Sequence, residues 1–234
     1  MQRILITGSN RGLGLGLVKQ YLRQDDSFIF ATCRNPDDAS ELKQLAAKHE
    51  NRIMILKLDA ADQNSIEDAA GVAGESVDGL DILINNAAMN PKSIQSFEGI
   101  DRATMMALFE VNSVAPLMIV RAFVQLLRRG RNPRIVNVSS QVGSMDWKRS
   151  GGSYAYAASK AALNMVTRCL AGDLRGDGIT TITLHPGWVQ TDMGGAGASL
   201  AIDESVGAIR NLIAGLTPED NGQFFKWNGE PHPW

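Results

Sequence analysis

Ile4-Leu5-Ile6-Thr7-Gly8-Ser9-Asn10-Arg11-Gly12-Leu13-Gly14 is the stretch that decides the fold of this chain. A short apolar run leads into three glycines spaced Gly-x3-Gly-x-Gly, and helical periodicity follows at 13–24. Glycine tolerates tight backbone dihedrals and lets a phosphate approach the main chain, while the free N–H groups of a helix start favour an anion. The stretch predicts a strand, a phosphate-binding turn and a helix, with candidate nucleotide contacts at Gly8, Asn10, Arg11, Gly12, Leu13 and Gly14.

The same alternation of strand and helix continues along the chain. Apolar runs without polar alternation, typical of parallel strands covered on both faces, lie at 4–6, 28–31, 53–58, 82–84, 135–138 and 179–184. Helical periodicity separates them at 13–24, 37–49, 65–77, 101–128, 153–174 and 203–216, and a last edge strand is expected at 223–227. This order predicts an α/β protein with a doubly wound, mostly parallel sheet (a Rossmann fold) and helices on both faces. Without a repeat or linker, we expect one domain over 1–234.

Composition narrows the classes of partner. The chain has 23 basic and 25 acidic residues and no long run of either sign, so neither a nucleic acid nor an anionic membrane is indicated. Its two cysteines, Cys33 and Cys169, form no CxxC pattern, and its three histidines are scattered, which predicts no metal site. We expect no secretory leader, because Ile4-Leu5-Ile6 and a glycine turn follow Met1 almost at once, and we expect no membrane span, because no apolar stretch approaches the roughly 20 residues that span a bilayer. We expect a soluble, cytoplasmic protein that binds small molecules.

The end of the second expected strand bears on cofactor choice. An NAD-selective site presents a carboxylate to the adenosine ribose there, whereas this chain has Arg34. A guanidinium is suited to a 2′-phosphate, and Arg11 in the glycine turn can reach the same group. The sequence therefore predicts NADP (NADPH) rather than NAD, the alternative being that Arg34 is a solvated loop residue.

Two further loops extend the expected nucleotide site. Asp59 and Ala60 follow the third strand, where the carboxylate is placed to accept from the adenine amino group; Asp62 can equally be a helix cap. Asn85-Asn86-Ala87 ends the fourth strand, and its small residues would let the backbone lie beside the ribose.

The expected catalytic chemistry lies at Tyr156 and Lys160, four residues apart in an alanine-rich run and so on one face of a helix. An ammonium near a phenol favours phenolate and lowers its pKa, so this pair predicts a proton donor for a carbonyl oxygen. Taken alone, the pair is more often two surface residues. Ser140 ends the fifth strand, and strand alternation favours it over Ser139 for the cleft. No GxSxG elbow or suitably spaced histidine supports a hydrolase triad.

Asn112 and Pro116 lie four residues apart in the long expected helix. Proline has no N–H to donate to the Asn112 carbonyl, so the helix should open there and leave that carbonyl able to hold a water that relays protons towards Lys160. A simple kink that fits the helix to the sheet is an equal alternative.

Together these motifs resemble the single-domain short-chain dehydrogenase/reductases, over almost the whole chain. The glycine turn, His185-Pro186-Gly187-Trp188 with Thr191-Asp192-Met193, and the ending at 228–234 are similar to sniffer-like carbonyl reductases and bacterial C-factor relatives. The resemblance implies a catalytic tetrad of Asn112, Ser140, Tyr156 and Lys160, with Lys160 also on the nicotinamide ribose. It further implies nicotinamide contacts from the backbone at Pro186, Gly187 and Val189, and a mobile substrate lid at 190–202 in which Thr191 and Met193 approach the pyrophosphate.

The implied function is NADPH-dependent reduction of a carbonyl compound, reversible as alcohol oxidation. The alternative is a dinucleotide-binding signalling or regulatory protein of C-factor type. By analogy we expect a homodimer or homotetramer, although the helix faces at 101–128 and 153–174 can instead simply cover the sheet.

One departure from the family pattern concerns spacing. Ser140 and Tyr156 are sixteen positions apart, more than the dozen or so that is common, so an additional loop is expected at 148–153. Side chains near it are candidates for the substrate pocket or, equally, for apolar packing under a lid; they are Gln141, Met145, Trp147 and Trp188.

Overall fold

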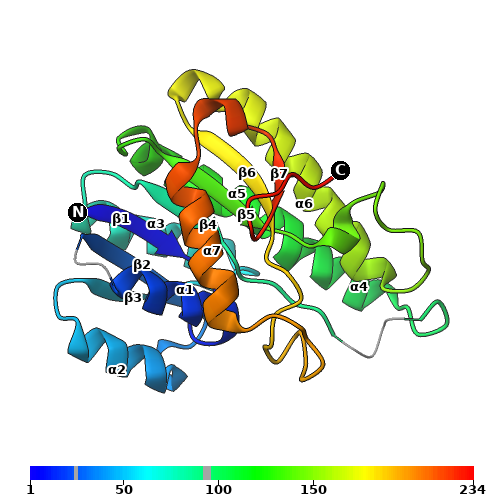
Figure 1. The fold of residues 1–234 in the computed structure, drawn as a ribbon. Coiled ribbons are helices and arrows are strands. Elements are labelled where there is room, and N and C mark those ends of the chain that lie inside the picture. The colour runs from blue at the N-terminus through cyan, green and yellow to red at the C-terminus, as the bar shows by residue number, and fades with distance from the viewer. Residues whose placement is uncertain (24–25, 92–95) are drawn as a thin grey trace.

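The computed structural model describes residues 1–23, 26–91 and 96–234 (Figure 1). Its centre is a seven-stranded sheet in which every neighbouring pair is parallel. The strands lie in the order β3 (Ile53–Lys57), β2 (Ser27–Cys33), β1 (Gln2–Ile6), β4 (Ile82–Asn85), β5 (Arg134–Val138), β6 (Thr180–His185) and β7 (Phe224–Lys226). The predicted doubly wound fold is confirmed, and the expected edge strand is β7.

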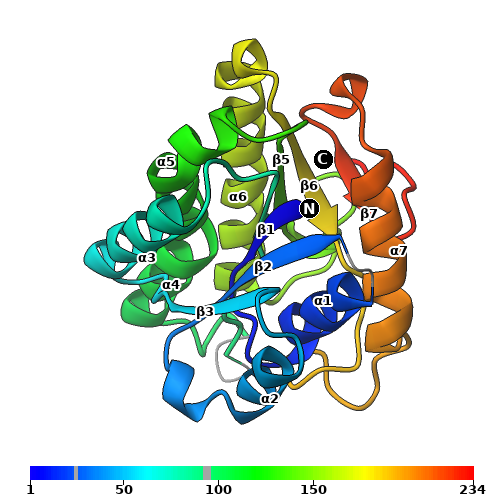
Figure 2. The ribbon, with the colours of Figure 1, turned by 90° about the vertical axis from the view of Figure 1, so that its left-hand side faces the viewer.

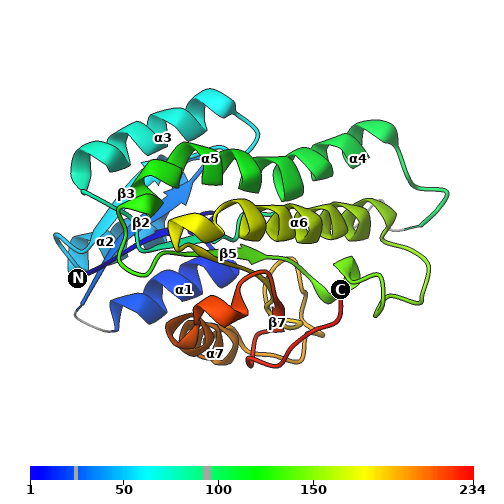
Figure 3. The same cartoon turned by 90° about the horizontal axis from the view of Figure 1, so that it is seen from above.

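Helices cover both faces of this sheet (Figures 2 and 3). On one face lie α1 (Gly12–Leu22), α2 (Ser40–Lys48) and α7 (Ile202–Gly215), and on the other α3 (Gln63–Ser76), α5 (Ala115–Arg128) and α6 (Tyr154–Asp173). Short 3₁₀ turns are η1 (Pro36–Asp38), η4 (Gln141–Gly143), η5 (Arg175–Asp177) and η6 (Pro218–Asp220). The first helix ends at Leu22, and position 24, its expected end, lies outside the described residues.

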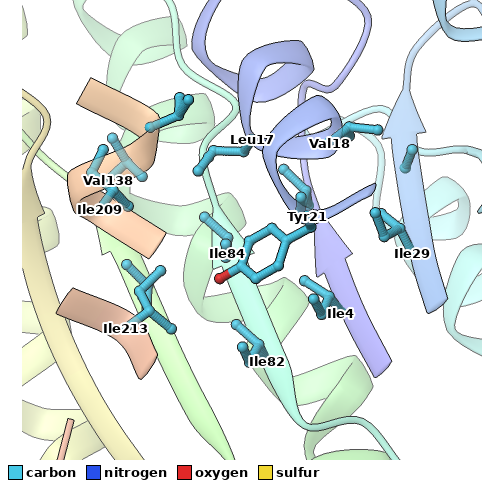
Figure 4. Packing of buried hydrophobic residues seen from close by; sticks show 14 of the residues in the cluster. Ile4, Leu17, Val18, Tyr21, Ile29, Ile82, Ile84, Val138, Ile209 and Ile213 are labelled. Atoms are coloured by element: carbon cyan, nitrogen blue, oxygen red, sulfur yellow. The ribbon is translucent and has the colours of Figure 1, made fainter. Parts of the chain in front are cut away.

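Two apolar cores result, because the central strands β1, β4, β5 and β6 are buried on both faces. Figure 4 shows the first core, where Leu17, Val18 and Tyr21 of α1 and Ile209 and Ile213 of α7 pack against strand residues. A fully buried side chain of this size contributes roughly 1.5–3 kcal/mol of transfer free energy. The second core holds α3, α5 and α6 against the opposite face. These cores hold the strand ends, and hence the loops that follow them, in place.

The order of the strands changes sense between β1 and β4: β2 and β3 lie on one side of β1, and β4 to β7 lie on its other side. Ile6 is paired with Ala31 of β2 on one side and with Ile84 of β4 on the other. The connections leaving β1 and β4 therefore diverge, which opens a crevice at the carboxyl ends of these strands, where open α/β sheets bind ligands.

The long helix expected at 101–128 is interrupted. It consists of α4 (Arg102–Phe109), a π-helical turn η3 (Glu110–Val114) and α5, and the N–H of Ala115 donates to the carbonyl of Glu110. The interruption comes just before Pro116, as the missing proline N–H predicts.

Contrary to the expectation from apolar runs, the helical stretch Arg102–Arg128 is by length and composition apolar enough to cross a membrane. Its buried side chains, including Ile119, Phe123 and Leu127, pack in the second core against the sheet. Packing of this kind is that of a core helix.

Candidate active site

A cavity of about 1300 Å³ opens at the carboxyl ends of the strands, large enough for a dinucleotide and a small substrate. Most of the residues selected from the sequence meet in its wall. They are Gly8, Asn10, Arg11, Gly12, Leu13, Gly14, Arg34, Asp59, Ala60, Asn86, Ala87, Ser140, Tyr156, Lys160, Pro186, Gly187, Val189, Thr191 and Met193. Asn85 and Asn112 are not among the lining residues.

The glycine turn forms a cradle for an anion. Gly8 and Gly12 have positive φ angles of 67° and 54°, and a Cβ on Gly14 would overlap the Gly8 carbonyl and lie 2.6 Å from Asn86 Nδ2. Helix α1 begins at Gly12 with no side-chain cap, so the N–H groups of its first turn face the cleft without a side-chain partner. These residues fit a pyrophosphate, because backbone donors and the helix dipole converge where side chains are absent.

Asn86 ties the loop after β4 to this turn. Its Nδ2 donates to the Thr7 carbonyl at 2.8 Å, while the Thr7 hydroxyl accepts from the N–H groups of Asn86 and Ala87 at 2.9 Å. The neighbouring loops are thus locked together at the crevice.

Asn85, in contrast, points away from the cleft that it was expected to line. Its Nδ2 donates to Asn137 Oδ1 at 2.8 Å and to the Pro116 carbonyl at 3.4 Å, and the side chain is 2% exposed. Strand alternation explains the difference, because Ile84 faces the first core and Asn85 must face α5. Asn85 braces the kinked helix against the sheet.

The adenosine end of the cleft carries a cation and a carboxylate. Arg34 is exposed in the wall and makes no ion pair with any residue that the structure describes. Arg11 instead pairs with Asp192 of the loop after β6, with Nη1 and Oδ2 2.8 Å apart. Asp59 Oδ1 accepts from the Ala61 N–H at 3.0 Å, which leaves its other oxygen available, and Asp62 caps α3 through the Asn64 N–H, the alternative considered for it.

Tyr156 and Lys160 share the inner face of α6. Lys160 is 2% exposed, its Nζ donates to the Val138 carbonyl at 2.8 Å, and Nζ lies 5.8 Å from the centre of the Tyr156 ring. Burial lowers the pKa of Lys160 to about 7. Burial also raises the pKa of Tyr156 to about 12, and the Ser140 hydroxyl partly offsets that rise. The phenol pKa therefore moves opposite to the expected direction, because the effect of desolvation is larger than that of Ser140.

The long spacing between Ser140 and Tyr156 is absorbed by a loop, and both side chains line the same cavity. Ser139 points to the other side of the strand end, where its hydroxyl donates to Asn164 Oδ1 at 2.7 Å. The choice of Ser140 over Ser139 from strand alternation agrees with this geometry. Gly143 lets the start of this loop pack closely against α6, since a Cβ at position 143 would lie 2.8 Å from the backbone of Lys160.

Asn112 is fully buried behind the wall of the cleft. Its Oδ1 accepts from the Met89 N–H at 2.9 Å, and its Nδ2 donates to the Met89 carbonyl and to Ser159 Oγ, each at 3.0 Å. Its side chain therefore fixes the loop after β4 against α6. Val111 and Met89, which sequence reasoning did not select, form the wall at this point.

His185 is a further lining residue that the sequence analysis did not select for the site. It ends β6 directly before Pro186-Gly187, a position that could have indicated it, and it is 8% exposed. Nδ1 is buried without a hydrogen-bond partner among the described residues. Burial, with His232 and Lys226 nearby, lowers the pKa of His185 to about 4, so the ring is neutral.

The loop expected as a lid is held to itself by hydrogen bonds. Val189 and Leu200 form a β-bridge, the Gln190 N–H donates to the Leu200 carbonyl at 2.9 Å, and Trp188 Nε1 donates to the Gly194 carbonyl at 2.9 Å. Gln141 and Trp188 line the cavity as expected, whereas Met145 and Trp147 do not. Within the described part of the chain, no cluster of three or more acidic, histidine or cysteine side chains could hold a metal ion.

Comparisons with known proteins agree with this geometry. The family model for short chain dehydrogenase matches residues 2–199. The NADPH-bound carbonyl reductase from chicken fatty liver is similar in structure, with a TM-score of 0.94 and 37% identity, over 100% of this chain and 99% of that one. Carbonyl reductase Sniffer of D. melanogaster has a TM-score of 0.94 and 38% identity, with both chains covered completely.

A third similarity is to C-signal of Myxococcus xanthus, which is 43% identical over 155 residues, 66% of this chain and 93% of that protein. The resemblance to sniffer-like reductases and C-factor relatives inferred from the motifs is confirmed. The chain belongs to the short-chain dehydrogenase family of oxidoreductases.

Proposed function

We propose that this protein is an NADPH-dependent reductase of aldehydes or ketones. The observation that carries the proposal is the position of Tyr156, which lines the same cleft as Ser140, Lys160 and the glycine turn and lies close to the Lys160 amine. A protein that only binds a dinucleotide has no need of this hydroxyl pair.

NADP fits the residues of the cleft. The backbone of the glycine turn would hold the pyrophosphate, Arg34 the 2′-phosphate, Asp59 the adenine amino group, and Lys160 the nicotinamide ribose. The bound nicotinamide supplies the hydride. Because position 34 is an arginine and not an acidic residue, NAD is the less suitable cofactor, and three of the similar solved proteins carry NADP(H).

Proton handling follows from the environment of Tyr156. A phenol with a pKa near 12 stays protonated at neutral pH, so it holds the proton that the product alkoxide needs. An aliphatic alcohol is a weaker acid than this phenol, and transfer of the proton from Tyr156 to the alkoxide is therefore downhill. Ser140 would donate a hydrogen bond to the same oxygen and stabilise its developing charge.

The second candidate is a dinucleotide-binding signalling protein. The similarity to C-signal favours it, while the complete set of Asn112, Ser140, Tyr156 and Lys160 favours an enzyme.

We further propose a homodimer or homotetramer formed through exposed apolar side chains of α4, η3 and α6, namely Met106, Val114 and Met165. A cytoplasmic location stays a prediction.

A turnover assay distinguishes the two functions. Purified protein is given NADPH and a broad panel of aldehydes and ketones, and its rate is compared with that of Tyr156→Phe. We expect at least one substrate to oxidise NADPH about 10²–10⁴ times faster with the native protein, at similar NADPH affinity. Equal rates for the native protein and Tyr156→Phe across the panel would refute the proposed reductase activity and favour the dinucleotide-binding signalling protein.

A further inference from the structure

Segment 228–234 folds back over the edge strand β7 and onto the loop 141–153. The Lys226 N–H donates to the Glu230 carbonyl at 2.8 Å, the His232 N–H donates to the Phe224 carbonyl at 2.7 Å, and Pro231 bridges to Phe225. Beyond β7, the Asp146 N–H donates to the Trp234 carbonyl at 2.8 Å. One short segment thus joins the edge of the sheet to a loop about 85 positions earlier.

Aromatic contacts reinforce this connection. The His232 ring lies 4.6 Å from Phe224, 6.1 Å from His185 and 6.4 Å from Trp147, measured between ring centres. The Trp234 ring lies 5.4 Å from Phe224, and the Arg168 guanidinium stacks over it at 5.2 Å. His232 is 6% exposed, so its packing is that of an interior residue.

Two of the groups contacted by this segment belong to the wall of the cleft or continue directly into it. His185 lines the cavity itself. The loop 141–153 begins with Gln141 and Val142, which also line it, and the Ser144 hydroxyl accepts from the Trp147 N–H at 3.0 Å. The loop is therefore held on one side by α6, through Asn164 Nδ2 and the Gly143 carbonyl, and on the other side by segment 228–234.

We propose that His232 and Trp234 are positioning residues that determine substrate specificity by holding the loop 141–153 and the His185 ring in place. The inference rests on the proposed reductase function. None of the lining residues of the cofactor turn contacts His232 or Trp234 in the interactions above, so the effect falls on the substrate side. Loss of the contacts that His232 and Trp234 make lets the cavity wall move. This weakens the binding of large substrates, which need a preformed wall, more than the binding of small ones.

The central test compares Trp234→Ala, Trp234→Phe and the native protein. With 2-acetylnaphthalene as a large ketone and propanal as a small aldehyde, we expect Trp234→Ala to raise KM for the ketone about tenfold more than KM for the aldehyde. The Kd for NADPH should stay within twofold, and Trp234→Phe should recover most of the ketone KM because it keeps a ring over Phe224. A uniform loss of kcat for both substrates with weakened NADPH binding would overturn the proposal, since it indicates a general structural role.

Two further variants guard against misfolding. Trp147→Ala breaks the contact with His232 from the loop side, and because Trp147 is 46% exposed and outside the cavity wall, the core should tolerate it. It should reproduce the KM pattern of Trp234→Ala. Glu230→Gln is the matched control, because it loses only an exposed ion pair with Lys226 in the same segment, and its kinetics should equal those of the native protein.

Limited trypsin digestion gives a readout that does not depend on turnover. Trypsin can cleave the loop 141–153 after the half-buried Lys148 and the exposed Arg149. Cleavage there, located by mass spectrometry, should be about tenfold faster in Trp234→Ala and Trp147→Ala than in the native protein and Glu230→Gln. Equal cleavage rates in the native protein and all three variants would overturn the proposal that segment 228–234 holds the loop in place. If the native protein reduces no carbonyl compound while the cleavage rates differ as expected, the proposed function is wrong, and the contact between segment 228–234 and the loop has a structural role only.

Discussion

Lys160 Nζ donates a hydrogen bond of 2.8 Å to the carbonyl oxygen of Val138, the last residue of β5. This contact holds a buried amine at the floor of the cleft, between the strand end that leads to Ser140 and the helix that carries Tyr156. Because the amine is desolvated, its pKa falls to about 7, and it can gain or lose a proton in the neutral range.

The first prediction concerns the effect of this amine on stability. The folded-state pKa of Lys160 is lowered relative to the unfolded chain, so between about pH 7 and 10.5 the unfolded state binds more protons than the folded state. The contribution of Lys160 to the free energy of unfolding should therefore be largest above that window and decrease as pH falls through it. Urea unfolding of the native protein and of Lys160→Met from pH 6.5 to 10.5 checks this: the free energy of unfolding should rise more steeply with pH in the native protein than in the variant. Parallel curves would contradict the burial of a titrating amine.

The second prediction separates the two adjacent serines. Ser140→Ala removes the hydroxyl that shares the cleft with Tyr156 and would bind the carbonyl oxygen, so kcat should fall about 10²–10³-fold while the Kd for NADPH is unchanged. Ser139→Ala is the control, because it removes a buried hydrogen bond to Asn164 and should cost about 1 kcal/mol of stability with little change in kcat. Steady-state kinetics and thermal unfolding of both variants check the assignment, and a larger kcat loss in Ser139→Ala would reverse it.

The third prediction concerns cofactor choice. Arg34→Asp replaces a cation that no acidic residue in the described part of the chain neutralises, and it should weaken NADPH binding about 10- to 100-fold while affecting NADH little. Arg11→Ala should discriminate less between the cofactors, since Arg11 is paired with Asp192. Fluorescence titration with both cofactors measures the ratio. Equal losses for NADPH and NADH in Arg34→Asp would rule out a contact with the 2′-phosphate.

The fourth prediction concerns the kinked helix. Pro116→Ala supplies the N–H that an α-helical bond to the Asn112 carbonyl requires, so the π-helical turn should relax and that carbonyl become occupied. If the carbonyl holds a proton-relaying water, kcat should fall several-fold while the Kd for NADPH stays nearly unchanged. Unchanged turnover would leave Pro116 as a kink that fits the helix to the sheet.

Much of the site follows from local sequence rules. The glycine turn, the apolar strands and the i, i+4 pair of Tyr156 and Lys160 each depend on neighbouring residues and on the periodicity of one element. Parallel strands bring their carboxyl ends to one edge of the sheet, so the meeting of these groups in one cleft could also be predicted. The helical distortion before Pro116 is likewise local, because it depends on a missing N–H.

Other properties depended on packing between distant parts of the chain. The direction in which the pKa of Tyr156 shifts is one example. Burial of the phenol raises this pKa, and the residues next to Tyr156 in the sequence do not indicate how deeply it is buried. The inward orientation of Asn85 is another, because the partner amide of Asn137 is 52 positions away. The third is the contact of segment 228–234 with the loop 141–153.

The sequence by itself therefore determined the fold class and the glycine turn, and it indicated the candidate reacting side chains, because periodicity and backbone chemistry are local. Only the tertiary structure decided how far those side chains are from water, which distant groups hold them, and how the longer loop brings Ser140 to Tyr156. Burial and long-range contacts arise when separate elements pack together, and no single stretch of residues specifies them.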